Sequence, residues 1–221
     1  MKGVILAGGN GTRLSPITET INKHLLPVYD KPLIYYPLSN LLLTGCDEIL
    51  VISSKESLIL LKNQLGNGER FGVSISYQAQ ESPDGIPSAI YLAKSFADGE
   101  DIWVSLGDNF IFGSRIKELY EKVNNSNKAT IFIKHVGNIS GLGSAKVGDG
   151  KIQNLKEKPK SSKPGWAVTG LYKFPNTVFE LIPTIKPSER NETEIIDILN
   201  MFLLSKNLDF QIFGRGVTWI D

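Results

Sequence analysis

Apolar runs of four to seven residues recur along the chain, separated by longer segments of mixed character. The runs at 4–7 and 102–106 are almost continuously hydrophobic, which is typical of strands that are buried on both faces. Other runs of similar length occur between and after them. We therefore predict strands at residues 4–7, 49–52, 73–77, 102–106 and 130–133.

The segments between these strands carry apolar residues at helical spacing. One such segment begins after Pro32 and stops before Gly45, and Ser88 is a candidate N-cap for another. The pattern predicts helices at 33–43, 56–65, 88–97 and 114–123. Because strands and helices alternate, we expect an α/β fold with a mainly parallel, mixed central sheet that is flanked by helices on both faces.

After residue 135 the pattern changes. The stretch SAKVGDGKIQNL predicts two short strands around a Gly-Asp-Gly turn, WAVTGLYKF predicts a further strand, and 192–204 predicts a helix with an acidic start. No internal repeat or low-complexity linker separates the two parts. We therefore expect a single domain over 1–221, with halves of about 1–135 and 136–221.

Composition and charge exclude several classes of function. Lys plus Arg (24) nearly balance Asp plus Glu (23), so the net charge is +1 and no bulk affinity for nucleic acid or anionic membrane is expected. The single cysteine, Cys46, excludes an internal disulfide, fits a reducing compartment, and is interpreted as a small buried hydrophobe. The apolar stretch at the start of the chain is too short to be the core of a signal peptide, and no apolar run approaches the length of a membrane span. We expect a cytoplasmic protein.

The stretch ILAGGNGTRLSPIT places three glycines directly after the first predicted strand. Glycines there let backbone N–H groups approach a phosphate closely, because no Cβ intervenes. The spacing is neither the G-x-G-x-x-G of dinucleotide-binding loops nor the Gly-Lys-Ser/Thr ending of a P-loop. Arg13 follows, where its guanidinium could hold the outer phosphates of a triphosphate. On these residues alone, a tight turn with an exposed arginine fits equally well.

Lys23 and Asp108 are further candidates for phosphate chemistry. Lys23 precedes an apolar turn and could neutralise a phosphate undergoing displacement, although a surface lysine is the plainer interpretation. Asp108 follows an apolar strand in VSLGDN, at the strand end where open α/β sheets bind ligands, and Mg²⁺ needs few protein oxygens there. A simple Asp-Asn turn is the alternative. Taken alone, LKEKPK indicates a solvated charge run and PSERNETE a helix start.

Seven stretches occur in an order that resembles the sugar-phosphate nucleotidyltransferases, and most of all the glucose-1-phosphate thymidylyltransferases. They are ILAGGNGTRLSPIT, NKHLLPVYDKPLIYYPLSNLL, SPDGIPSAI, LGDNF, EKP, AVTGLY and GRGVTWID. The resemblance implies a Rossmann-like nucleotidyltransferase fold. It also implies transfer of a nucleotidyl group from dTTP or UTP to a sugar-1-phosphate, with glucose 1-phosphate the expected acceptor, for activated-sugar synthesis of the dTDP-rhamnose type. The products would be an NDP-sugar and pyrophosphate, with no covalent enzyme intermediate.

The resemblance also implies roles for individual residues. Arg13, Lys23 and Asp108 would be catalytic, and Mg²⁺ would be held by Asp108 and Asp221. The nucleotide would lie against Leu6, Gly8, Gly9, Gly11, Thr12, Arg13, Gln80, Gly85 and Asp108. The sugar phosphate would lie against Gly143, Glu157, Lys158, Val168 and Arg190. The implied partners are these two substrates and further copies of the chain in a homo-oligomer.

Four features depart from the family's pattern. The chain has LGSAK at 142–146, IPSA at 86–89 and Asn-Glu at 191–192, where the family usually has YGVVE, LAQA and Gly-Glu. Family members also continue into further C-terminal helices, which are absent here, so we expect the strand that ends at Asp221 to be loosely held. Three alternatives stay open: a UTP-using sugar-1-phosphate uridylyltransferase, a non-catalytic sugar-nucleotide-binding paralogue, and an α/β dinucleotide-dependent oxidoreductase.

Overall fold

The computed structural model of the chain describes residues 1–9, 11, 14–82, 84–188 and 192–221. Its central sheet has nine strands: β1 (Lys2–Leu6), β4 (Glu48–Ser53), β5 (Ser74–Ala79), β6 (Ile102–Leu106), β8 (Ala129–Val136), β9 (Ser144–Gly148), β10 (Lys151–Lys156), β11 (Gly165–Phe174) and β12 (Leu208–Ile212). Two small two-stranded sheets join β2 (Pro27–Val28) to β3 (Lys31–Pro32) and β7 (Phe110–Gly113) to β13 (Val217–Ile220).

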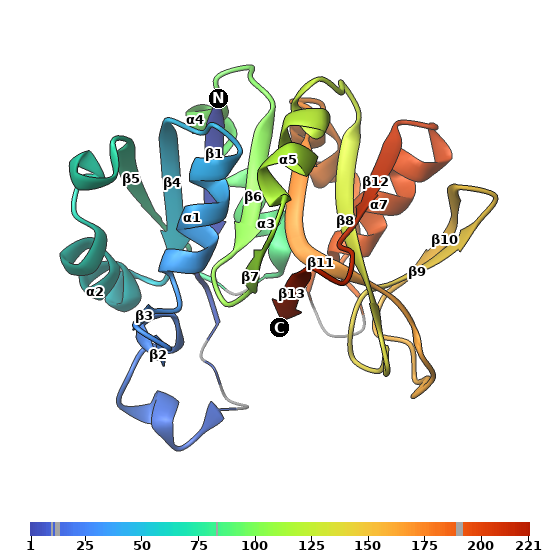
Figure 1. Cartoon of the computed structure of the whole chain (residues 1–221). Coiled ribbons are helices and arrows are strands. Elements are labelled where there is room, and N and C mark those ends of the chain that lie inside the picture. Colours follow the sequence, from blue (N-terminus) through green and yellow to red (C-terminus); the bar gives the residue numbers. More distant parts are fainter. Residues whose placement is uncertain (10, 12–13, 83, 189–191) are drawn as a thin grey trace.

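Helices cover the two faces of this sheet (Figure 1). The α-helices are α1 (Tyr35–Leu43), α2 (Lys55–Leu65), α3 (Ile86–Tyr91), α4 (Lys94–Ala97), α5 (Ile116–Asn124), α6 (Val178–Leu181) and α7 (Ile195–Leu204). Short 3₁₀ turns form η2 (Ile17–Glu19), η3 (Lys23–Leu25), η4 (Glu69–Phe71) and η5 (Ile182–Thr184).

The sheet is mixed, as predicted. Strands β6, β1, β4 and β5 lie side by side and are parallel, and each of the five strands predicted from the first half of the chain is present within a few residues. On the other side of β6 the long strand β11 runs antiparallel. The sheet continues from β11 through β8 to β12, while the β9–β10 hairpin pairs with the first part of β11.

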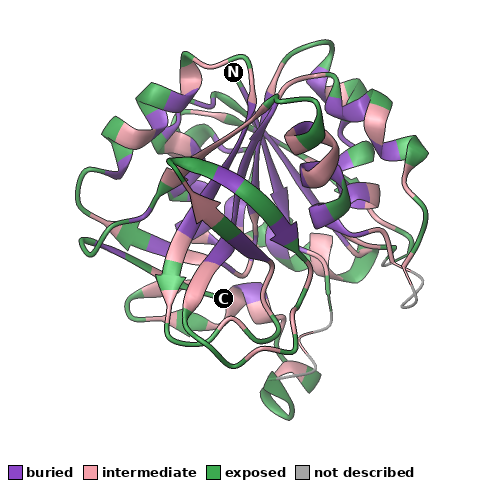
Figure 2. Ribbon diagram, turned by 90° about the vertical axis from the view of Figure 1, so that its right-hand side faces the viewer, coloured by how far each residue is buried: buried purple, intermediate pink, exposed green. Residues whose placement is uncertain are grey.

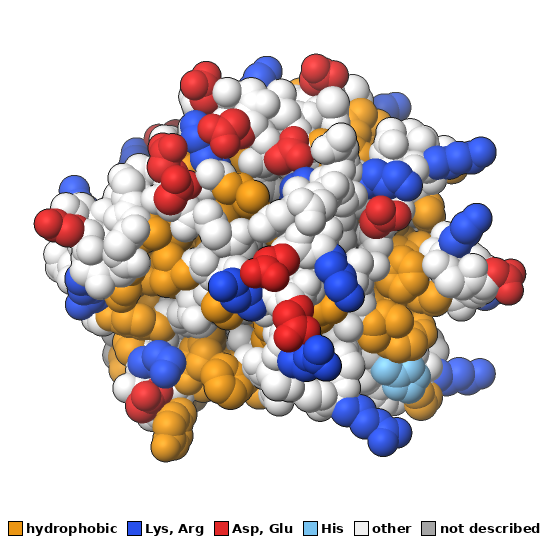
Figure 3. Space-filling model, turned by 45° about the horizontal axis from the view of Figure 1, so that its top comes forward, with side chains coloured by type: hydrophobic (Ala, Val, Ile, Leu, Met, Phe, Trp, Pro, Cys, Tyr) orange, Lys and Arg blue, Asp and Glu red, His pale blue; other side chains and the backbone are white. Residues whose placement is uncertain are grey.

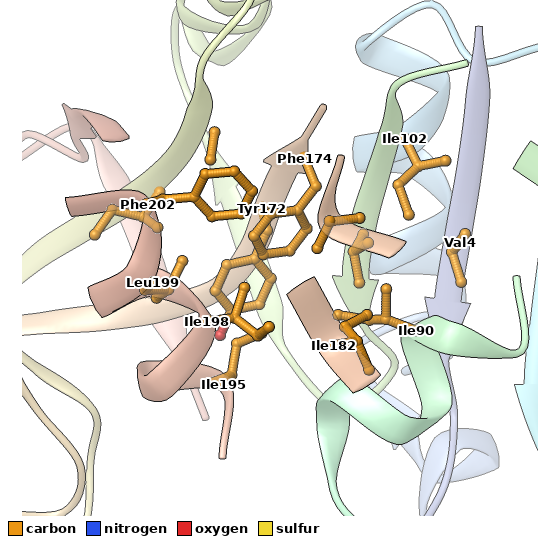
Figure 4. Packing of buried hydrophobic residues seen from close by; sticks show 14 of the residues in the cluster. Val4, Ile90, Ile102, Tyr172, Phe174, Ile182, Ile195, Ile198, Leu199 and Phe202 are labelled. Carbon is orange, nitrogen blue, oxygen red and sulfur yellow. The ribbon is translucent and has the colours of Figure 1, made fainter. Parts of the chain in front are cut away.

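Alternating side chains of the strands build one core on each face of the sheet. In β1, Val4 and Leu6 pack with α3, α6 and α7, whereas Ile5 packs on the opposite face with α1, α2 and α5. Figure 2 shows the buried strands between these partly exposed helices. In Figure 4 the apolar side of α7 faces Tyr172 and Phe174 of β11, whose rings stack with centroids 5.7 Å apart. Burial on both faces thus fixes the strands that carry the site.

Two helix predictions are wrong in detail. The helix expected at 88–97 is divided into α3 and α4, and Ser88 lies inside α3 instead of capping it; its hydroxyl contacts the Thr193 hydroxyl at 3.0 Å. The helix expected from 192 begins at Ile195. The backbone N–H of Thr193 donates to the Asp84 carbonyl at 2.8 Å, and this bond holds Thr193 in an extended bridge.

The surface carries charges of both signs. On the face that Figure 3 shows, Lys and Arg side chains are interspersed with Asp and Glu, in keeping with the net charge of +1. Cys46 is 3% exposed, and burial raises its pKa to about 11, so it is the small buried hydrophobe that the sequence predicts. Within the described ranges, every helix is too short or too polar to cross a membrane.

Candidate active site

The candidate site lies at the carboxyl ends of the parallel strands. From β1 the chain passes to β4 on one side and returns through β5 to β6 on the other, so the strand order reverses beside β1. In open α/β sheets this reversal forms the crevice in which ligands bind. The loops that follow Leu6, Ala79 and Leu106 enter this crevice.

The glycine loop after β1 approaches other site residues closely. A Cβ at Gly8 would lie 3.4 Å from Oε1 of Gln80, which follows β5. Gly9 has φ +87°, and a Cβ there would lie 3.5 Å from Nζ of Lys23. The lack of a Cβ at Gly8 and Gly9 therefore leaves space beside Gln80 and Lys23, as a phosphate cradle requires.

Lys23 and Asp108 form an ion pair at the centre of the site. Lys23 Nζ donates to Asp108 Oδ2 at 2.6 Å, and their side chains are 15% and 33% exposed. Burial disfavours the Asp108 carboxylate, but the charge and hydrogen bond of Lys23 outweigh this effect and hold its pKa below the usual range. His24 is 0% exposed, and burial together with the Lys23 charge lowers its pKa to about 3. His24 is therefore neutral at pH 7 and acts as a core residue.

Two pockets meet at Asp108. The glycine-loop pocket is lined by Leu6, Gly8, Gly9, Gln80, Gly85, Ile86, Ala89, Leu106, Asp108, Glu192 and Thr193. The β11 pocket is lined by Ile86, Leu106, Asp108, Gly141, Leu142, Gly143, Glu157, Lys158, Val168, Gly170, Tyr172, Ile195, Ile196, Trp219 and Asp221. Ile86, Leu106 and Asp108 belong to both linings, so ligands in the two pockets would lie next to one another.

The structure separates the predicted residues between these pockets. Leu6, Gly8, Gly9, Gln80, Gly85 and Asp108 of the nucleotide set lie in the glycine-loop pocket; Gly143, Glu157, Lys158 and Val168 of the sugar-phosphate set lie in the β11 pocket. Gly11 lies outside both linings, with its carbonyl bonded to the Thr18 hydroxyl at 2.8 Å. Thr12, Arg13 and Arg190 lie outside the described residues. Motifs that are far apart in the sequence thus come together in these two linings.

The terminal strand is held firmly, contrary to our expectation of a loose one. β13 pairs along its length with β7, and Lys134 Nζ donates to the carbonyls of Gly214 and Val217 at 2.6 Å each. Asp221 itself accepts a hydrogen bond from Asn109 Nδ2 at 2.9 Å. Pairing with a strand and a buried side chain thus fixes the position of the carboxylate.

The two carboxylates that the resemblance assigns to Mg²⁺, Asp108 and Asp221, lie on either side of one amide. Both carboxylates accept hydrogen bonds from the same amide, that of Asn109, so their oxygens lie close together. Across the described part of the chain, no three His, Cys, Asp or Glu side chains group as a closed metal site would need. Two carboxylates fit Mg²⁺, which takes few protein ligands and leaves the remaining positions to water and phosphate.

Several lining residues were not identified from the sequence. Thr193 joins the loop before α7 to the loop before α3: a Cβ at Gly85 (φ +105°) would lie 2.1 Å from the Thr193 carbonyl oxygen. Tyr172 and Trp219 of the β11 pocket were also unassigned, as was Asn109, which is buried and accepts a hydrogen bond from Trp219. The resemblance included the stretches around them, but no local pattern indicates that they come together.

Comparison with known proteins agrees with this geometry. The model of the nucleotidyl transferase family matches residues 2–221. A glucose-1-phosphate thymidylyltransferase of Neisseria meningitidis serogroup A / serotype 4A is 44% identical over 223 residues, which cover 100% of this chain and 77% of the relative. One from Mycolicibacterium smegmatis is 39% identical over 222 residues, with the same two coverages.

Solved structures are similar over the whole chain. A Bacillus anthracis protein provisionally named a glucose-1-phosphate thymidylyltransferase, solved with a sucrose, has a TM-score of 0.91 and 38% identity and covers 100% of this chain and 89% of its own. A UDP-glucose pyrophosphorylase complexed with UDP-glucose has a TM-score of 0.83 and 25% identity, with coverages of 100% and 92%. These matches favour nucleotidyl transfer over the oxidoreductase alternative.

Proposed function

The chain belongs to the nucleotidyl transferase family, and we propose that it transfers a nucleotidyl group from dTTP or UTP to a sugar-1-phosphate, with glucose 1-phosphate the expected acceptor. The observation that carries the proposal is the shared wall of the two pockets. Six of the predicted nucleotide residues line one pocket, four of the predicted sugar-phosphate residues line the other, and Asp108 lies in both. The products would be an NDP-sugar and pyrophosphate.

The reaction asks for little covalent chemistry from the protein. An oxygen of the sugar phosphate attacks the α-phosphorus, a new P–O bond forms, and the bond to the β-phosphate oxygen breaks and releases pyrophosphate. A phosphate monoester has a second pKa of about 6, so the attacking oxygen is already ionised at pH 7. The reaction therefore needs no general base to deprotonate the sugar phosphate, and neutral His24 is not required for this purpose. Positioning and charge neutralisation carry the catalysis.

The residues of the two pockets, together with Lys23, which pairs with Asp108, would supply these effects. The glycine loop would cradle the triphosphate, Lys23 would neutralise charge near the α- and β-phosphates, and Lys158 would hold the sugar phosphate. Asp108 and Asp221 would hold Mg²⁺, which supplies further charge neutralisation at the phosphates when it is bound. Glu157, in the β11 pocket, would accept hydrogen bonds from sugar hydroxyls.

Pyrophosphate release tests this function. The purified chain is assayed with each of four nucleoside triphosphates and several sugar-1-phosphates, in the presence of Mg²⁺. Release that requires both substrates supports the proposal. Binding of nucleotide and sugar phosphate without any release would instead identify a non-catalytic binding protein.

We expect dTTP and UTP to be used and ATP and GTP to be poor substrates. The Gln80 amide lies beside the glycine loop and can pair with the O4/N3 edge of thymine or uracil. Adenine lacks such a carbonyl and N–H edge, and guanine presents it only on a larger, two-ring base. The values of kcat/KM for dTTP and UTP should differ by no more than one methyl group contributes to transition-state binding, about 1–3 kcal/mol. Gln80→Leu should reduce kcat/KM for dTTP, whereas Gln78→Leu, at an exposed position of β5 two residues earlier, should not. Equal efficiency with ATP would refute this base pocket.

Lys158→Ala should raise the KM for sugar-1-phosphate by roughly 10- to 100-fold, as expected from loss of a charged hydrogen bond of about 1.5–3 kcal/mol. The KM for the triphosphate should change less, because Lys158 lines only the β11 pocket. Arg190→Ala should behave in the same way. The control is Lys156→Ala, two residues earlier and exposed outside both linings. Equal shifts in both KM values would contradict the assignment.

A further inference from the structure

Asn109 is the buried centre of the network between the two carboxylates. Its side chain is fully enclosed, at 0% exposure. Its Oδ1 accepts hydrogen bonds from the Gly170 backbone N–H at 2.9 Å and from the Trp219 indole N–H at 2.6 Å. Its Nδ2 donates to Asp221 Oδ1 at 2.9 Å and to Asp108 Oδ1 at 3.3 Å. Both donors and both lone pairs of the amide are thus engaged.

The orientation of this amide is determined by its neighbours. The N–H groups of Gly170 and Trp219 can only donate, so the Asn109 oxygen must face them and its nitrogen must face the carboxylates. Gly170 permits the approach, because a Cβ there would lie 2.5 Å from Asn109 Cγ. Strand β11, the turn after β6 and strand β13 therefore meet at one side chain.

We propose that Asn109 is a positioning residue for the divalent cation. It donates one hydrogen bond to each carboxylate and so fixes their relative position, although the two negative groups repel one another. Mg²⁺ tolerates little deviation from octahedral coordination, so ligands that are fixed in advance bind it better than mobile ones. Asn109 has this effect through Asp108 and Asp221, without contact to the cation. The inference rests on the proposed function, which assigns the cation to these carboxylates.

Cation affinity tests the proposal directly. Mn²⁺ is titrated into the full chain without substrates, and free Mn²⁺ is followed by electron paramagnetic resonance. Asn109→Ala should raise the Kd for Mn²⁺ roughly 10- to 100-fold, the range for lost partners of metal ligands. Trp219→Phe, which keeps the ring and removes only the indole donor, should raise it less. This milder variant keeps the test decisive if Asn109→Ala does not fold.

Asn124→Ala is the matched control. The Asn124 side chain also accepts an indole N–H, from Trp103 at 3.0 Å, and donates to the Thr44 carbonyl at 2.9 Å, but it contacts neither carboxylate. It should leave the Kd for Mn²⁺ unchanged even where it lowers Tm. In the catalytic assay, Asn109→Ala should raise the Mg²⁺ concentration for half-maximal rate and recover rate at high Mg²⁺. A purely structural asparagine would shift neither quantity.

Three results would overturn the inference: an unchanged Kd for Mn²⁺ in both Asn109→Ala and Trp219→Phe, an equal rise in Asn124→Ala, or no saturable Mn²⁺ binding by the wild-type chain. Pyrophosphate release is measured separately. If the wild-type chain binds Mn²⁺ and Asn109→Ala weakens this binding, but no pyrophosphate is ever released, the proposed function fails and the positioning role of Asn109 stands.

Discussion

Asp108→Asn should lower kcat by roughly 10²-fold or more, the loss typical of removing one electrostatic stabiliser of a transition state. Asparagine keeps the shape of the side chain, but it removes the negative charge that pairs with Lys23 and would hold the cation. Nucleotide affinity measured without divalent cation should change little, because the base and triphosphate have other contacts. The measurement is kcat for pyrophosphate release at saturating substrates.

The control for this variant is Asp209→Asn, which removes an exposed carboxylate whose ion pair with Lys128 spans 3.6 Å. It should leave kcat unchanged, because exposed pairs contribute little. Near-wild-type turnover of Asp108→Asn would contradict the assignment of this residue. A large loss of kcat in Asp209→Asn would indicate that the loss of kcat in Asp108→Asn is not specific to its position in the site.

We also expect the effect of Asp108→Asn on the unfolding free energy to depend on pH. The pKa of Asp108 is lowered in the folded chain, so its ionised form stabilises the fold at neutral pH. This contribution is complete above the ordinary pKa of an aspartate and is lost as the pH falls through the lowered value. The difference in unfolding free energy between wild type and Asp108→Asn should therefore be present at pH 7 and shrink in acid.

The parallel part of the fold could be predicted from sequence because its signals are local. Continuous apolar runs identify strands buried on both faces, and the glycine loop follows the first of them directly. The boundaries that were wrong depend on distant contacts. Thr193 is held in a bridge to Gly85, so α7 begins later than its acidic residues suggest. No periodicity within the segment contains that information.

The role of Asn109 could not be predicted from the sequence for the same reason. Its partners Gly170, Trp219 and Asp221 are 61, 110 and 112 residues away in the chain. The neighbouring Asp108 was identified because a carboxylate at a strand end has a recognisable chemistry, whereas an asparagine in a turn has none of its own. The expectation of a loose terminal strand was wrong because β7 offers a pairing edge that only the folded chain provides.

Lys23→Met should lower kcat by roughly 10²- to 10³-fold, since it keeps the unbranched stem and removes the ammonium group. Lys31→Met is its control: Lys31 pairs with Asp30 at 2.8 Å, whereas Lys23 pairs with Asp108, which lines both pockets, so the Lys31 variant should have wild-type kcat. A kcat near that of wild type in Lys23→Met would show that this ammonium group takes no part in the reaction.

A double variant shows how Lys23 acts. In this structure Lys23 donates a hydrogen bond to Asp108. One hypothesis is that Lys23 affects the reaction only by holding that carboxylate in position. In that case Lys23→Met combined with Asp108→Asn would be no slower than Asp108→Asn alone, because the two losses would be one and the same. If Lys23 instead neutralises charge on the phosphates, each residue contributes separately, and we expect the double variant to be slower than either single variant by at least tenfold. A double variant with the kcat of Asp108→Asn alone would make Lys23 a positioning residue for Asp108 and remove it from the catalytic set.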